Sequence, residues 1–286
     1  MTDAVDRTPV GRVLGTDDST PLEYWVALGE GQYLQLDDVV ATSRVLPDGQ
    51  EVAMYGMVEQ VRARQEGAQF DSDVFLIEDG VLPAQTTQAA KVLTTRVEPE
   101  VFVPPLPGAP VHKAIDDQRA QALYFDQMDG KLPAGLTRDG EPFFLDTSFL
   151  DGSAGAHVNI SGVSGVATKT TYATFLLYSL FNAGVLGGTE TNTKALIFNV
   201  KGEDLLFLDH DNRSAAFDDA QRSRYAALGL PVGAFASVGI VAPPRPGDAS
   251  ASPHVGARTT GVAPFFWTIE EFCGQRLLPF LFADAE

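Results

Sequence analysis

The sequence predicts two domains of different class, a small all-β barrel followed by an α/β domain. Up to about residue 103, short runs rich in Val, Leu, Tyr and Trp alternate with Gly, Asp and Pro, which is typical of strands and turns. A proline-dense stretch follows, and after residue 151 a strand pattern, a glycine-rich loop and a helix pattern come in succession. The length of 286 residues also suggests two domains. We expect the barrel at 1–104, a linker and lead-in segment at 105–150, and the second domain at 151–286.

The barrel strands are expected in six short segments. These segments are 11–14, 23–28, 39–45, 51–64, 74–77 and 89–93. Strands at this spacing with turn residues between them are typical of a small barrel or sandwich. Tyr24 and Trp25 are interpreted as barrel core rather than as a platform for stacking nucleic-acid bases.

The segment 104–111 carries four prolines within seven positions. Proline removes amide donors and fixes φ, so we expect neither a helix nor a central strand to continue there. The domain boundary is placed at this linker. After it, a short helix is expected over 114–128 and a short strand over 143–146.

The second domain is expected to begin with a βαβ unit. The segments 157–161 and 194–200 read as buried parallel strands, and the apolar run 172–181 between them reads as a helix that Gly184 ends.

The loop between the first strand and the helix has the residues of a phosphate-binding P-loop. Such a loop needs small residues, a helix N-terminus, a lysine for the β/γ-phosphates and a hydroxyl for Mg²⁺. The candidate ATP-binding residues are Gly162, Ser164, Gly165, Val166, Ala167, Thr168, Lys169, Thr170 and Thr171. The spacing departs from the pattern, because Lys169 stands seven rather than six residues after Gly162. If the loop contains one extra residue relative to the pattern, Lys169 takes the lysine position and Thr170 the hydroxyl position. If the pattern is aligned without a gap, Thr168 takes the lysine position and Lys169 the hydroxyl position. The third alternative is an ordinary glycine-rich βα turn that binds no phosphate.

Four segments, taken in their order along the chain, resemble the HerA-type branch of the HerA/FtsK ATPases. They are the start of the barrel at 11–14, the proline-rich segment 105–111, the segment 157–162 and the segment 199–203. The resemblance covers residues 10–286. It implies a RecA-like P-loop ATPase core, ATP and Mg²⁺ as cofactors, and a hexameric ring that moves double-stranded DNA through a central pore, often with a nuclease partner. Lys169 and Glu203 are then the candidate catalytic residues, and Thr170 is the candidate Mg²⁺ ligand.

Two departures from the family limit this resemblance. Asn199 replaces the usual aspartate of the second motif, and no Walker B strand is found; 205–210 is the nearest candidate and follows Glu203 too closely. In the family that strand lies further along the chain, so we expect an incomplete core that binds ATP without efficient turnover. The alternative function is a nucleotide-binding or scaffold protein with an inactive P-loop, whose barrel is an interaction module.

Composition excludes several other classes. The formal net charge is −18, and 25 of the 38 acidic residues lie in the first 150 positions, which argues against a basic nucleic-acid-binding outer surface. No apolar run is long enough for a membrane helix and no signal peptide is present, so a cytoplasmic protein is expected. The single cysteine excludes a disulfide framework.

A few side chains have a structural interpretation rather than a catalytic one. We expect Cys273 in the core, His157 in a structural role, 270–271 at a helix start and 209–211 in a solvated turn rather than around a metal ion.

Overall fold

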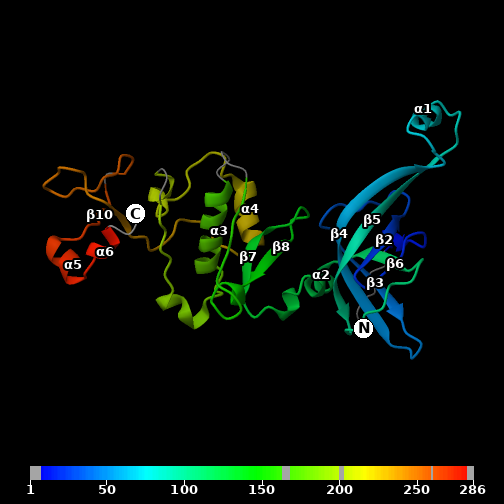
Figure 1. Cartoon of the computed structure of the whole chain (residues 1–286), viewed down its shortest axis with the longest axis horizontal. Coiled ribbons are helices and arrows are strands. Elements are labelled where there is room, and N and C mark those ends of the chain that lie inside the picture. Colours follow the sequence, from blue (N-terminus) through cyan, green and yellow to red (C-terminus); the bar gives the residue numbers. More distant parts are fainter. Residues whose placement is uncertain (1–7, 163–167, 200–202, 259, 282–286) are drawn as a thin grey trace. The chain divides into compact units, whose positions relative to one another are not determined.

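The computed structural model describes residues 8–162, 168–199, 203–258 and 260–281. The chain forms two compact units, Met1–Asp129 and Gly130–Glu286, which are treated separately below (Figure 1).

The first unit is built on a closed barrel, which confirms the barrel prediction. Its strands are β1 (Gly11–Val13), β2 (Glu23–Leu28), β3 (Val39–Val45), β4 (Glu51–Glu66), β5 (Gln85–Glu98) and β6 (Pro110–Lys113). Their order around the barrel is β1-β2-β5-β4-β3-β6, and neighbouring strands are antiparallel throughout. Closure of the sheet leaves no unpaired edge, which is the main advantage of this architecture.

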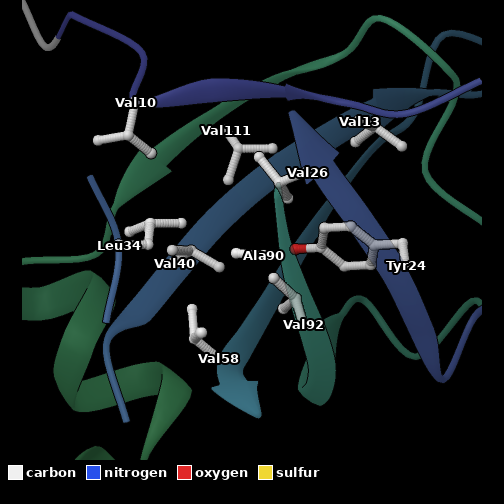
Figure 2. Packing of buried hydrophobic residues seen from close by; sticks show 10 residues of the cluster. All are labelled: Val10, Val13, Tyr24, Val26, Leu34, Val40, Val58, Ala90, Val92 and Val111. Atoms are coloured by element: carbon white, nitrogen blue, oxygen red, sulfur yellow. The ribbon is translucent and has the colours of Figure 1, made fainter. Parts of the chain in front are cut away.

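Small β-branched side chains fill the inside of the barrel. Tyr24 and Val26 alternate with half-buried residues along β2 and face the centre together with Val92 from β5 (Figure 2). The full cluster comprises Val10, Val13, Tyr24, Val26, Leu34, Val40, Val58, Ala90, Val92 and Val111. Each fully buried valine or leucine contributes about 1.5–3 kcal/mol relative to an exposed position. Trp25 lies on the other face of β2, half-buried, so the prediction of barrel core holds for Tyr24 and is wrong for Trp25.

The last barrel strand begins inside the segment that the sequence assigns to the linker. β6 pairs with β1 at Gly11↔Val111 and with β3 at Ala41↔His112, and so closes the barrel. Pro110 is its first residue, where the missing N–H disturbs the ladder least. The first compact unit therefore extends to Asp129 and includes α2 (Asp116–Ala122) and the 3₁₀ turn η1 (Phe125–Gln127), which occupy the segment where a helix was expected.

Strands β4 and β5 are much longer than their neighbours and continue as a two-stranded ribbon. Their pairing runs out to Glu66↔Gln85, and the short helix α1 (Asp73–Glu78) lies at the far end (Figure 1). The strand expected at 74–77 is therefore wrong, because this segment lies in α1. The Asp73 carboxylate accepts hydrogen bonds from the backbone of Gln69 and Phe70, at 2.8 and 3.0 Å, and starts a turn there.

A glycine is required within the barrel part of β4, where Gly56 pairs with Val40 of β3 and Thr94 of β5. The register of β4 against β5 shifts between Tyr55 and Gly56. A Cβ atom on Gly56 would lie 2.4 Å from Val92 Cγ1 and 2.6 Å from the carbonyl oxygen of Leu93. Any side chain at this position would collide with the facing strand, so the close pairing of β4 and β5 at the register shift depends on glycine.

The second unit consists of short strands and helices, and its α-helices other than α6 are six to fifteen residues long. Its elements are β7 (Lys131–Leu136), β8 (Pro142–Asp146), η2 (Thr147–Phe149), α3 (Thr168–Asn182), η3 (Gly187–Asn192), η4 (Asp204–Phe207), α4 (Asp219–Ala227), β9 (Ile240–Ala242), β10 (Val262–Pro264), α5 (Ile269–Gly274) and the shorter α6 (Leu278–Leu281). β7 and β8 form an antiparallel hairpin, and β9 and β10 form a parallel pair. The strand expected at 143–146 is confirmed by β8, and the helix expected at 172–181 is confirmed by α3. No helix in the described ranges is long and apolar enough to cross a membrane.

The two strands expected to flank α3 are not formed. Residues 157–161 and the described residues 194–199 lie in no strand, so the predicted βαβ unit is absent from the part that the structure describes. Leu196 and Phe198 are 78% and 80% exposed. An apolar run becomes a buried strand only where neighbouring strands satisfy its backbone and cover its side chains.

Candidate functional site

The candidate site is the first turn of α3 and the loop before it. Lys169, Thr170 and Thr171 lie in this turn. The ammonium nitrogen Nζ of Lys169 donates a hydrogen bond to the carbonyl oxygen of Gly162 at 3.0 Å. The ammonium group of Lys169 therefore contacts Gly162, the residue at which the loop begins. A lysine charge thus lies at the N-terminus of a helix, a place where phosphate groups often bind.

Much of the predicted loop lies outside the described residues. This applies to Ser164, Gly165, Val166 and Ala167, and to the side chain of Thr168. Of the remaining candidates, Gly162, Thr170 and Thr171 are exposed and Lys169 is half-buried. The carbonyl oxygen of Thr170 accepts a hydrogen bond from Thr174 Oγ1 at 2.8 Å, one turn along the helix.

Side-chain hydrogen bonds fix α3 to the hairpin β7–β8. Ser179 is fully buried and its hydroxyl donates to the carbonyl oxygen of Pro133 at 2.7 Å. The hydroxyl of Tyr172 donates to the carbonyl oxygen of Ala134 at 3.0 Å. Burial raises the pKa of Tyr172, so this donor keeps its proton at neutral pH. The helix that carries Lys169 is therefore held by hydrogen bonds that depend on particular side chains.

Aromatic rings pack around Tyr178 in the C-terminal half of α3. Tyr178 packs edge-on against Phe235, with ring centroids 5.3 Å apart, and against Tyr225 of α4 at 6.2 Å. The Tyr178 hydroxyl donates to the carbonyl oxygen of Pro231 at 3.2 Å. Burial raises the pKa of both tyrosines. These contacts add rigidity behind the candidate loop.

Glu203, the second candidate catalytic residue, binds backbone amides. Its carboxylate accepts hydrogen bonds from the N–H groups of Gly256 and Ala257, at 2.8 and 2.5 Å, and these bonds lower its pKa. Glu203 is thus ionised and holds the 254–258 loop. Among the described residues, no hydrogen bond or ion pair joins Glu203 to Lys169.

Arg258 is a residue that the sequence interpretation missed. Its guanidinium donates two hydrogen bonds to the Asp209 carboxylate, at 2.6 and 2.8 Å, and others to the carbonyl oxygens of Leu206 and Thr260. The bond from Arg258 is the main reason that the pKa of Asp209 falls to about 2. A signal was available, since Arg258 is the only Lys or Arg between Arg245 and Arg276, but its partner is 49 residues away.

The turn 209–211 is consequently more than a solvated loop. Asp209 pairs with Arg258, and Asp211 Oδ1 accepts a hydrogen bond from the backbone of Ala234 at 3.1 Å, so the two carboxylates have separate partners. In the part of the chain that the structure describes, no group of three or more His, Cys, Asp or Glu side chains is placed to hold a metal ion.

The remaining structural interpretations had mixed outcomes. Thr268 and Glu271 form a reciprocal capping box at the start of α5, which confirms a helix start at 270–271. Cys273 is exposed, so its placement in the core was wrong. His157 is exposed as well.

A hollow of about 290 Å³ lies on the first unit. It is lined by Ala41, Thr42, Ser43, Glu51, Ala53, Tyr55, Pro110, His112 and Gln118. The lining has no Lys or Arg to neutralise phosphate charge and carries the acidic Glu51. Its chemistry therefore does not suit a nucleoside triphosphate.

No family model matches the chain, and no curated protein matches it at a significant level.

Proposed function

We propose that the chain binds ATP with Mg²⁺ at the loop before α3 and acts as a HerA-type DNA-translocating ATPase in a hexameric ring. The observation that carries this proposal is the Lys169–Gly162 contact of 3.0 Å at the start of α3. It supports the reading with one inserted residue, in which Lys169 neutralises phosphate charge and Thr170 supplies the Mg²⁺ ligand. The amides from Gly165 to Lys169 would cradle the β-phosphate.

A RecA-like core is part of this proposal. It needs 157–161 and 194–200 to pair as parallel strands beside α3. Such pairing would bury Val158, Leu196 and Phe198, which are 47%, 78% and 80% exposed. Apolar groups of this size in contact with water favour association with a covering surface, and ring assembly is one means of covering them.

The proposal is tested by ATP binding to the Lys169→Ala variant. Isothermal titration with Mg·ATP is expected to show saturable binding to the wild-type chain and at least a 100-fold loss in the variant, because the phosphate charge loses its cation. Lys131→Ala is the matched control, since Lys131 is an exposed lysine on β7. Equal affinity of wild type and Lys169→Ala would contradict the inserted-residue reading.

The second candidate function is a nucleotide-binding scaffold with an inactive P-loop and a barrel interaction module. The two backbone hydrogen bonds of Glu203 favour it, because a carboxylate that holds a loop is not free to orient water. Steady-state ATP hydrolysis with and without double-stranded DNA separates the two functions. DNA-stimulated turnover by assembled rings supports the translocase, and binding without DNA stimulation supports the scaffold.

A further inference from the structure

The end of the β4–β5 ribbon exposes several large apolar side chains together. We call residues 67–84 the ribbon tip. Phe70 and Val81 are 71% exposed and Phe75 is 66% exposed, and Val74 and Leu76 lie beside Phe75 on α1 at 44% and 45%. Soluble proteins seldom place this many large apolar groups on a protruding element without a partner.

The tip is an ordered structure. Asp73 is buried and its carboxylate accepts hydrogen bonds from the backbone of Gln69 and Phe70. These bonds lower the pKa of Asp73, so the carboxylate stays ionised. The base of the ribbon is fixed as well, because the Arg62 guanidinium lies 3.9 Å from the Trp25 ring centroid and pairs with Asp17 at 3.0 Å. The turn that carries Phe70 and leads into α1 therefore has a defined backbone geometry, which reduces the entropic cost of binding.

The charge around these apolar groups is of one sign. Between Arg64 and Lys91 the chain has five acidic residues and no Lys, Arg or His. Asp71 follows Phe70 in the sequence, Glu78 is the last residue of the helix that carries Phe75, Asp79 follows it, and all three are exposed. A complementary surface must combine an apolar groove with a basic border.

We propose that the ribbon tip docks into an apolar groove bordered by Lys and Arg on a partner protein. Phe70 and Phe75 would fill the groove, and Asp71, Glu78 and Asp79 would meet the basic border. The tip of a second copy is a poorer occupant because it carries the same acidic residues and has no Lys, Arg or His. An anionic membrane surface would also repel the acidic tip. The proposal is independent of ATP binding at α3.

A displayed library of random 16-residue peptides, selected against the purified full chain, provides the probe. We expect the selected peptides to mix Lys or Arg with large apolar residues. The Kd of the synthetic peptides should rise at least tenfold for Phe70→Ser/Phe75→Ser and at least threefold for Glu78→Gln/Asp79→Asn at low ionic strength. Leu22→Ser is the matched control, because Leu22 is 68% exposed on the same unit, and should bind as wild type does.

Several outcomes would overturn the proposal. These are peptides that bind the Phe70→Ser/Phe75→Ser variant as tightly as wild type, peptides that need the tip but carry no basic residue, and a selection that yields no tip-dependent peptide. If sedimentation velocity shows self-association that Phe70→Ser/Phe75→Ser abolishes, the occupant is a second copy of the chain. If the chain binds phosphatidylserine vesicles and the same variant abolishes this binding, the occupant is lipid. Circular dichroism checks the fold of each variant, and Glu78→Gln/Asp79→Asn decides if the aromatic variant does not fold.

Discussion

The hydroxyl of Tyr24 lies in the barrel core among valine and alanine side chains (Figure 2). It is fully buried and has no hydrogen-bond partner among the described residues. Burial raises the pKa of Tyr24, so the group stays neutral, but its donor is unsatisfied. A buried hydroxyl without a partner costs about 1–3 kcal/mol.

Tyr24→Phe is therefore expected to stabilise the barrel by about 1 kcal/mol, since it removes the unsatisfied group and keeps the ring. Val92→Ala at the neighbouring core position should destabilise it by about 1–3 kcal/mol. The free energy of unfolding from urea denaturation measures both effects. A Tyr24→Phe variant less stable than wild type would show that the hydroxyl has a partner.

At the residue scale, the two-residue period of a strand predicts which side chains are buried, whereas apolar character alone does not. Tyr24 and Val26 follow the period of two and lie inside, while Trp25 between them covers the outer face under Arg62. Cys273 was expected in the core because apolar residues surround it, but α5 exposes that face. Apolar neighbours in sequence do not show whether anything packs against them.

At the element scale, the pair Asp209–Arg258 and the bonds of Glu203 join the η4 segment to the 254–258 loop. Neither contact follows from local sequence, because each spans about 50 residues. The same limit applies to strands. Helix α3 was predictable from its own composition, whereas 194–199 needed a neighbouring strand that no local pattern supplies.

Asp209→Asn should weaken the second unit in a pH-dependent way. The folded-state pKa of Asp209 is depressed from 3.8 to about 2 by Arg258, so its stabilising contribution is present above about pH 4. That contribution is lost as the pH falls from about 4 towards 2. The difference in Tm between wild type and Asp209→Asn should accordingly be largest at pH 5–7 and shrink in acid.

Thermal melts from pH 2 to 7 check this, with Asp139→Asn as the control because Asp139 is exposed in the β7–β8 turn. A Tm difference for Asp209→Asn that stays constant down to pH 2 would show that charge on Asp209 does not stabilise the fold.

At the scale of the whole molecule, acidic residues are concentrated in the first 150 positions of the sequence. Residues 1–150 hold 25 acidic and 11 basic residues, and residues 151–286 hold 13 and 9. The charge therefore argues against a basic outer surface. The barrel was predictable because its strands pair in short, regular succession. The parallel strands predicted at 157–161 and 194–200 are not formed in the described residues, because an apolar run becomes a parallel strand only where distant partners pair with it.

Hydrogen–deuterium exchange of the full chain, with and without saturating Mg·ATP, tests the central claim most directly. If the loop before α3 cradles phosphate, ATP should slow exchange at residues 162–171 in wild type and not in Lys169→Ala, while barrel residues 10–113 stay unchanged. Unchanged exchange at 162–171, or protection confined to the barrel, would contradict the account.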